Sequence, residues 1–213
     1  AEPLLPAQGN RRVTAPPRVV LASASPARAR LLAAAGVTFT VSPVRVDEGE
    51  IRDSLAAEGA SVANAAQTLA ELKAERCSAR ESDAVVIGGD QILALDARWF
   101  GKAATMDEAR AQLRDLRGRA HVLSTAVAVA RDGKAVWRHV VAAKMTMRDF
   151  TDAFLDAYLD AEGEAALGSV GAYCLEGRGA QLFSRVEGDY FGILGLPLLP
   201  LLAYLRQQGA LAA

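Results

Sequence analysis

Residues 19–36 read VVLASASPARARLLAAAG and pass directly from an apolar run into signals for a helix start. The apolar run from Arg18 to Ala22 is typical of a buried strand. Ser25 can cap a helix whose first residue is Pro26, and Gly36 supplies the left-handed residue that ends such a helix. The stretch therefore predicts a strand, a turn and a helix in immediate succession.

Strand and helix patterns continue along the rest of the chain, with no internal repeat and no linker between independent units. In the first half we predict a strand at 39–43, an acidic loop entering a short helix at 46–55, a long helix at 61–79 and an apolar strand at 83–95, which two glycines and an aspartate stop before it resumes. A helix then runs from the capping box Thr105–Glu108 to Leu116, and two strands follow around an Asp132–Gly133 turn. The remaining predicted elements are a helix at 151–159, loops and short strands at 168–195, and a last helix from Pro197. We expect one domain over residues 18–213. Residues 1–17 lack periodicity and are rich in proline, so we expect a flexible extension or a cloning remnant.

Composition excludes several classes of protein. Hydrophobic residues make up 51% of the 213 residues and the net charge is -1, so the basic excess of a non-specific nucleic-acid binder is absent. No apolar run approaches the about 20 residues of a membrane span. Cys77 and Cys174 match neither a disulfide framework nor zinc-ligand spacing, and we expect a cytoplasmic protein in which both pack as free thiols.

The predicted helix start after the first strand is a candidate anion site. Amide groups and the helix dipole gather positive potential there, and Ser23, Ser25 and Arg28 add donors beside them. A phosphate fits this chemistry, although the stretch is neither a Walker loop nor a dinucleotide fingerprint. The alternative is that Ser25 only caps the helix while Arg28 and Arg30 lie on the surface.

Two carboxylates are candidates for metal binding or base catalysis. Asp90 follows VVIGG at what is predicted to be a strand end, where glycines leave room for a ligand or a hydrated ion. Glu48 lies in the predicted acidic loop and has the oxygen chemistry that magnesium prefers. In the alternative interpretation, Asp90 caps a turn and Glu48 is a solvated loop charge.

Two lysines are candidate phosphate partners. Lys73 lies at the edge of the apolar face of the long helix, where a lysine usually extends to solvent. Lys102 follows an aromatic pair and a glycine, which suits contact with phosphate from a tight turn and equally suits a hairpin corner. His121 and His139 have no paired acid or serine nucleophile nearby in sequence, so we assign them structural roles.

In this order, the motifs resemble the Maf family of nucleotide pyrophosphatases over nearly the whole chain from Val19. The segments that carry the resemblance are LASASPARARLL, the Asp47–Glu48 pair, LAELKA with Lys73, VIGGDQIL with Asp90, GKA with Lys102, LRGRAHVLST, GAYCLEGRGAQLF and VEGDYFGILGLPL. The resemblance implies an α/β fold with an elongated mixed sheet flanked by helices, and two lobes around a central cleft. It further implies a homodimer that hydrolyses nucleoside triphosphates to the monophosphate and pyrophosphate with a divalent metal, Mg²⁺ or Mn²⁺.

The resemblance also assigns roles to the candidate residues. Glu48 and Asp90 become the acidic pair for metal binding and water activation; Asp90 is the expected base, although the two roles can be exchanged. The remaining assignments are phosphate binding by Ser23 and Arg28, and electrostatic contact with the triphosphate by Lys73 and Lys102. Such cations suit a reaction that spreads negative charge over phosphate oxygens and a departing pyrophosphate.

Three positions bear on the choice of base. Ala27 stands where many members have a second arginine, so one phosphate contact is expected to be absent. Gln91 and Glu176 resemble the subgroup associated with 7-methyl-GTP, whereas the tail EGDYFGILGLPL is similar to the subgroup that acts on dTTP and UTP. Glu176 either adds a third carboxylate to the metal site or lies in a glycine-rich loop. Base preference therefore stays open at this point.

The sequence leaves two functions from different classes. One is a metal-dependent pyrophosphatase that removes non-canonical, methylated or surplus nucleotides. The other is a non-catalytic nucleotide-binding regulator of cell division, since the family name is tied to septum inhibition. Both acids and both lysines are present, which favours catalysis. The expected partners are a nucleoside triphosphate and a second copy of the chain, with no membrane and no specific nucleic acid.

Overall fold

The structure is a computed structural model that describes residues 16–212. Its strands are β1 (Arg18–Leu21), β2 (Thr40–Val41), β3 (Ala84–Leu95), β4 (Arg98–Phe100), β5 (Ala120–Arg131), β6 (Lys134–Met147) and β7 (Phe183–Glu187). Its α-helices are α1 (Pro26–Ala34), α2 (Glu48–Ala57), α3 (Val62–Ser78), α4 (Met106–Leu116), α5 (Asp152–Glu162), α6 (Tyr190–Ile193) and α7 (Leu198–Gln207), with 3₁₀ helices η1 (Gly163–Gly168) and η2 (Arg178–Leu182). The predicted extension at residues 1–17 lies outside the described residues except for Pro16 and Pro17.

All seven strands form one mixed sheet in the order β2-β1-β3-β5-β6-β7, with β4 paired to β3. The β2–β1 and β1–β3 pairs are parallel, and the other pairs are antiparallel. The long β5–β6 hairpin turns at Asp132 and Gly133, whose φ angles of 48° and 77° are those of the predicted two-residue turn. The expected α/β class with an elongated mixed sheet is confirmed.

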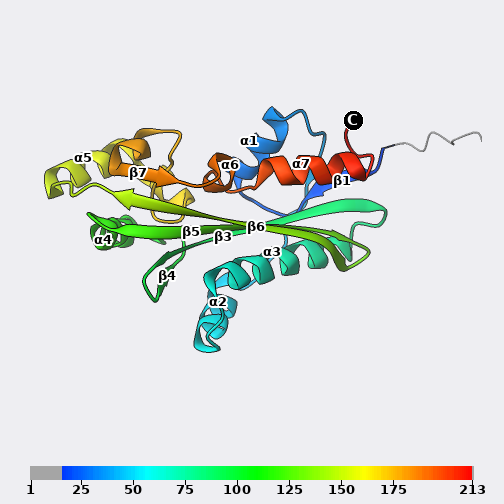
Figure 1. Ribbon diagram of the computed structural model, residues 1–213, viewed down its shortest axis with the longest axis horizontal. Coiled ribbons are helices and arrows are strands. Elements are labelled where there is room, and N and C mark those ends of the chain that lie inside the picture. Colours follow the sequence, from blue (N-terminus) through cyan, green and yellow to red (C-terminus); the bar gives the residue numbers. More distant parts are fainter. Residues whose placement is uncertain (1–15, 213) are drawn as a thin grey trace, which may run out of the picture.

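Helices cover both faces of the sheet (Figure 1), and the alternation of β5 side chains shows why. Val127 and Val129 pack with α1 and α7 on one face, whereas Ala126 and Ala128 pack with α3 on the other. Because successive strand residues point to opposite faces, a strand covered on both sides must be apolar throughout. The larger side chains face α1 and α7, and the alanines allow α3 to approach the sheet closely.

Gly88 marks the closest approach of α3 to β3. A Cβ atom at this position would lie 2.2 Å from the Ala70 carbonyl oxygen and 2.7 Å from the Ala74 amide nitrogen. Both are backbone atoms of α3, so nothing flexible can move aside. The absence of a side chain at Gly88 therefore allows α3 to pack directly against β3, two residues before Asp90.

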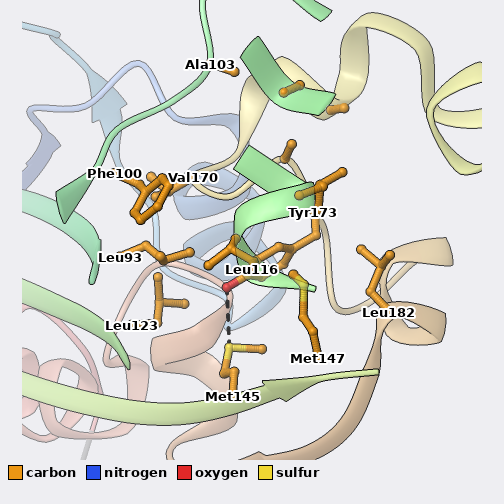
Figure 2. Packing of buried hydrophobic residues seen from close by; sticks show 14 of the residues in the cluster. Leu93, Phe100, Ala103, Leu116, Leu123, Met145, Met147, Val170, Tyr173 and Leu182 are labelled. Atoms are coloured by element: carbon orange, nitrogen blue, oxygen red, sulfur yellow. Dashed lines mark hydrogen bonds between the residues drawn. The ribbon is translucent and has the colours of Figure 1, made fainter. Parts of the chain in front are cut away.

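A separate hydrophobic cluster fills the other end of the sheet, around α4 and α5 (Figure 2). Leu93 of β3, Leu123 of β5 and Met145 of β6 contribute side chains from the sheet. Tyr173 reaches into this cluster from the segment after η1, and its hydroxyl donates a hydrogen bond to Met145 Sδ at 3.5 Å. The loop that carries Tyr173 is thereby anchored to the sheet.

Two sequence-based expectations about local structure were wrong. β3 does not stop at the glycines; it is continuous from Ala84 to Leu95, because β5 pairs with it from Val86 to Ala94. Asp90 therefore lies in the middle of a strand. Glu48 is not in a loop but is the first residue of α2, since Asp47 caps the helix by accepting from the Glu50 amide at 3.0 Å.

Within the described residues, no helix is both long enough and apolar enough to span a membrane. Cys77 and Cys174 are free thiols, as expected, and Cys77 is buried.

Candidate functional site

A gap in the edge of β3 creates the site. β1 pairs with β3 only as far as Ile87, and β4 joins the same edge only from Leu93. In between, no described strand covers that edge. Asp90 and Gln91 point to opposite faces of the sheet because they are successive residues of one strand, yet both line the same cavity. The cavity therefore reaches both faces of the sheet through the gap.

This cavity has a volume of about 550 Å³. It brings together every candidate residue of the sequence analysis: Ser23, Ser25, Arg28, Glu48, Lys73, Asp90, Gln91, Lys102 and Glu176. They come from the β1–α1 junction, α2, α3, β3, the turn after β4 and the segment after η1. Side chains 153 residues apart in the sequence thus share one hollow.

The β1–α1 junction gathers hydroxyl, guanidinium and helix-start amide groups at the cavity wall. Ser25 caps α1, its Oγ lying 3.5 Å from the Arg28 amide. Arg28 is only 8% exposed; its NH1 donates to Ser23 Oγ at 3.0 Å and its Nε to the Gly195 carbonyl oxygen at 2.8 Å. Burial lowers the pKa of Arg28 from its usual value. The surface alternative is wrong for Arg28, because packing against the chain near Gly195 encloses it, whereas Arg30 is exposed.

Lys73 and Asp90 form a buried ion pair in the wall of the cavity. Lys73 Nζ lies 2.6 Å from Asp90 Oδ1 and 2.7 Å from Glu48 Oε1. The side chains of Lys73 and Asp90 are 7% and 5% exposed, and that of Glu48 is 51% exposed. Lys73 does not extend to solvent, because its ammonium donates a hydrogen bond to Asp90 of β3 and pairs with Glu48 of α2. Desolvation raises the pKa of Asp90, an effect that the neighbouring Lys73 and Arg28 oppose.

The two carboxylates have the chemistry to hold a divalent cation. Both bind one Lys73 ammonium, so the place between them already accommodates positive charge. Among residues 16–212, no group of three or more His, Cys, Asp or Glu side chains has metal-binding geometry. Magnesium is commonly held by one or two carboxylates together with substrate phosphates and waters. Glu48 and Asp90 fit that mode.

Lys102 enters the cavity from the turn after β4. Its backbone forms an isolated antiparallel bridge with Val170, which ties this turn to the segment after η1. Partial burial lowers the pKa of the Lys102 ammonium from its usual value, and the cations Arg28 and Lys73 lower it further. Lys102 therefore belongs to one cluster of cations around the cavity.

Gln91 lies on the opposite side of β3 from Asp90, where its orientation is set by three acceptors. Its Nε2 donates to Thr125 Oγ1 at 2.8 Å, to the Gly192 carbonyl oxygen at 3.0 Å and to the Ile193 carbonyl oxygen at 3.1 Å. Its Oε1 receives no hydrogen bond from a described residue. The amide thus presents an acceptor.

Glu176 is a second acceptor in the cavity wall. It lies beyond the segment that Tyr173 anchors, and its Oε1 is 3.7 Å from Arg30 NH2 of α1. Within the described chain, Glu176 forms no ion pair with Lys73, whereas Glu48 and Asp90 both do. Glu176 is therefore not a third carboxylate beside Glu48 and Asp90.

Further side chains that the sequence analysis missed also line the cavity, among them Arg52, Tyr173 and Cys174. Cys174 was expected to be a packing residue, but it is only half-buried and borders the cavity. Arg52 lies four residues after Glu48, which is the spacing of one helix face. That spacing would have identified it, had Glu48 been recognised as the start of a helix.

His121 has the structural role expected of it. It is buried, and its Nε2 lies 3.0 Å from the Tyr173 hydroxyl. Burial lowers the pKa of His121 to about 4, so the ring is neutral at physiological pH. His139 stacks on Trp137, with ring centroids 6.1 Å apart.

Comparison with known proteins gives a consistent result over nearly the whole described chain. The family model described as Maf-like protein matches residues 18–208. A nucleoside triphosphate pyrophosphatase of Paramagnetospirillum magneticum is 56% identical over 192 residues, which cover 90% of this chain and 99% of the relative. One of Granulibacter bethesdensis is 54% identical, with 91% and 98% covered. A 7-methyl-GTP pyrophosphatase of Rhizobium meliloti is 50% identical, with 92% and 99% covered.

Proposed function

The chain belongs to the Maf-like protein family, and on that premise we propose that it is a nucleoside triphosphate pyrophosphatase. The observation that carries the proposal is the buried Lys73–Asp90 pair in a cavity that the start of α1 also lines. A carboxylate, a cluster of cations and an anion-binding helix start are the groups that phosphate anhydride hydrolysis requires.

In the proposed reaction, water attacks the α-phosphorus of the substrate. Its oxygen forms the new P–O bond, the bond from the α-phosphorus to the bridging oxygen breaks, and the products are the monophosphate and pyrophosphate. Asp90 is the base that takes the proton from water. Burial raises its pKa, which makes its carboxylate a better proton acceptor than an exposed aspartate. Glu48 is half-exposed and has the supporting role of an oxygen ligand.

The cationic side chains position the carboxylates and bind the phosphate groups. Lys73 Nζ holds Asp90 Oδ1 and Glu48 Oε1 in place, and Lys102 lies where it can neutralise charge that develops on phosphate oxygens. Ser23 and the start of α1 bind a phosphate group. Arg28 fixes Ser23 through its NH1, and its buried charge adds to the positive potential of this junction. Ser25 remains the helix cap.

We propose a divalent metal, Mg²⁺ or Mn²⁺, held by Glu48 and Asp90. When bound, it would neutralise charge on the phosphate oxygens and orient the triphosphate. The proximity of the two carboxylates to one Lys73 ammonium supports this assignment.

For the base, we propose a preference for 7-methylguanine. This base carries a positive charge and presents N–H donors along its pairing edge, which require acceptors. Gln91 offers its Oε1 because its Nε2 is engaged by Thr125 and α6, and Glu176 offers a carboxylate. The name of the Rhizobium meliloti relative, a 7-methyl-GTP pyrophosphatase, is consistent with this preference.

A substrate panel tests the function and the base preference together. Pyrophosphate release is measured with 7-methyl-GTP, GTP, dTTP, UTP and ATP, each with Mg²⁺, with Mn²⁺ and with a chelator. We expect release from 7-methyl-GTP at the highest kcat/KM, and none with the chelator. Tight nucleotide binding by folded protein without any product would instead support the non-catalytic regulator of cell division. Release that favours dTTP and UTP would refute only the base preference.

We also propose that the protein acts as a cytoplasmic homodimer. The side chains of Tyr190 and Leu199 are 53% and 59% exposed, and a second copy that packed against them would bury apolar area. The free thiols of Cys77 and Cys174 suit a reducing compartment. Light scattering coupled to size-exclusion chromatography measures the mass in solution, and a monomer at all concentrations would refute the dimer.

A further inference from the structure

We propose that Arg52 binds the terminal phosphate of the triphosphate and the pyrophosphate product, a role that rests on the proposed function. Arg52 is in the second turn of α2 and lines the cavity. It is the only cation on this helix, since the residues from Glu48 to Ala57 read EGEIRDSLAA. A guanidinium matches phosphate oxygens with two parallel N–H donors.

The first step of the inference is that α2 is oriented by its apolar side. Ile51 and Leu55, one helical turn apart, pack against the hydrophobic cluster on α3. Glu48 and Arg52 are also one turn apart, and both border the cavity. The same packing that delivers Glu48 to Lys73 therefore delivers Arg52 to the cavity wall.

The second step is that nothing in the described chain neutralises Arg52. Glu48, four residues earlier, is the usual kind of partner for it. That carboxylate is instead directed to Lys73 Nζ at 2.7 Å. No described carboxylate lies within 4.0 Å of the Arg52 guanidinium nitrogens. A half-buried guanidinium without an anion, at the wall of a site for a polyanion, is suited to bind the anion.

The third step concerns Gly101, the residue before Lys102. A Cβ atom at Gly101 would lie 2.5 Å from Arg52 NH1 and 3.1 Å from Arg52 Cζ. The guanidinium thus lies over the backbone of this turn, beside Lys102. Glycine leaves the space that the guanidinium fills, and Arg52 and Lys102 together form one cationic wall.

The fourth step assigns this wall to phosphate rather than to the base. Arg52, Glu48 and Lys73 come from α2 and α3, on the face of the sheet to which Asp90 points. The acceptors proposed for the base do not belong to this wall: Gln91 donates to the Gly192 carbonyl oxygen of α6, and Glu176 lies 3.7 Å from Arg30. The leaving pyrophosphate carries the most negative charge and is the group that this wall fits.

The test is product inhibition by inorganic pyrophosphate, compared with inhibition by the nucleoside monophosphate. For Arg52→Gln we expect the inhibition constant of pyrophosphate to rise about 10- to 100-fold, which corresponds to the loss of hydrogen bonds to a charged group. The constant for the monophosphate should stay unchanged. Arg52→Lys keeps the charge without the paired donors, so its inhibition constant for pyrophosphate should lie between those of the parent protein and Arg52→Gln. Arg80→Gln, which removes an exposed arginine outside this cavity, is the matched control.

Gly101→Ala gives a second, independent variant. The new methyl group would displace the guanidinium without removing it, so pyrophosphate should bind more weakly than to the parent protein. In the Arg52→Gln background the same change should have no further effect on pyrophosphate binding. An additive effect would mean that Gly101 acts through Lys102 instead, and would contradict the pairing of Gly101 with Arg52.

An unchanged inhibition constant for pyrophosphate in folded Arg52→Gln, with catalysis intact in the parent, overturns this inference alone. Absence of pyrophosphate release from the parent protein overturns the proposed function. In that case calorimetric titration of both proteins with inorganic pyrophosphate still decides the role of Arg52: weaker binding by the variant supports it, and equal binding refutes it.

Discussion

Lys73 Nζ lies 2.6 Å from Asp90 Oδ1, and the two side chains are 7% and 5% exposed. They belong to α3 and β3, which approach each other closely at Gly88, two residues before Asp90. The pair is thus both the centre of the proposed chemistry and a part of the packing between helix and strand. Its two functions can be separated by mutation.

Asp90→Asn should lower kcat by about 10²- to 10⁴-fold, the usual contribution of a general base. The fold should survive, because the amide keeps the volume of the side chain and Lys73 retains Glu48 as a partner. Pyrophosphate release measures the rate, and circular dichroism checks the fold. Asp96→Asn, at an exposed turn, should leave the rate unchanged. Near-normal turnover by Asp90→Asn would remove Asp90 from the mechanism.

Lys73→Met should destabilise the protein by about 3 to 5 kcal/mol at pH 8, because it leaves the Asp90 carboxylate buried without its cation. The loss should be smaller at pH 5. Without Lys73, the pKa of Asp90 in the folded protein rises further above its value in the unfolded chain. The folded state therefore binds this proton more strongly than the unfolded state does, and the free energy of unfolding falls as pH rises.

Urea denaturation of four proteins measures this coupling: the parent, Lys73→Met, Asp90→Asn and the double variant. The double variant should be more stable than Lys73→Met at pH 8, since it buries no unpaired charge. If adding Asp90→Asn brings no recovery, the cost of Lys73→Met arises from packing and not from charge.

Gly88→Ala should destabilise the protein by about 3 kcal/mol, because the added Cβ meets the Ala70 carbonyl oxygen at 2.2 Å and forces α3 away from β3. Gly168→Ala is the matched control, since its Cβ would meet nothing within 4 Å and its φ is not in the left-handed region. Chemical denaturation compares their free energies of unfolding. Equal values for both variants would refute the close packing at Gly88.

His121 should make stability depend on pH between about 4 and 6.5. Burial lowers its pKa to about 4, whereas the unfolded chain binds the proton near pH 6.5. Stability should therefore fall as pH decreases through this interval, by about 3 kcal/mol in total. His121→Gln should remove this component and His139→Gln should not. The free energy of unfolding, measured in urea from pH 4 to 7, tests this, and identical pH profiles for all three proteins would contradict it.

Much of the local structure was predictable because its causes are local. The caps of α1 and α4 each depend on a hydroxyl that accepts a hydrogen bond from the amide three residues later. Ser25 accepts from the Arg28 amide, and Thr105 accepts from the Glu108 amide. The Asp132–Gly133 turn depends on two adjacent residues. The prediction of a loop at Glu48 was wrong, because Asp47 caps α2 by accepting a hydrogen bond from the Glu50 amide, a cause that is equally local.

The candidate site was predictable as a set of residues but not as a geometry. Residue chemistry and resemblance to a family together identified nine side chains, and all nine line one cavity. Their roles remain predictions. Nothing in the sequence near Lys73 indicates that it is buried, since a lysine at that position on a helix usually reaches solvent. Its burial depends on Asp90, which lies on another element.

The sequence by itself determined the order of the elements, their caps and turns, and the residue types available for chemistry, because these follow from interactions within a few residues. Only the tertiary structure decided that β3 runs on past the end of β1, which leaves its edge open at Asp90. It also decided that Arg28 meets the Gly195 carbonyl oxygen and that Arg52 lies over Gly101. The physical reason is that burial and ion pairing depend on which distant surfaces meet, and a single helix or strand carries only one of the two surfaces.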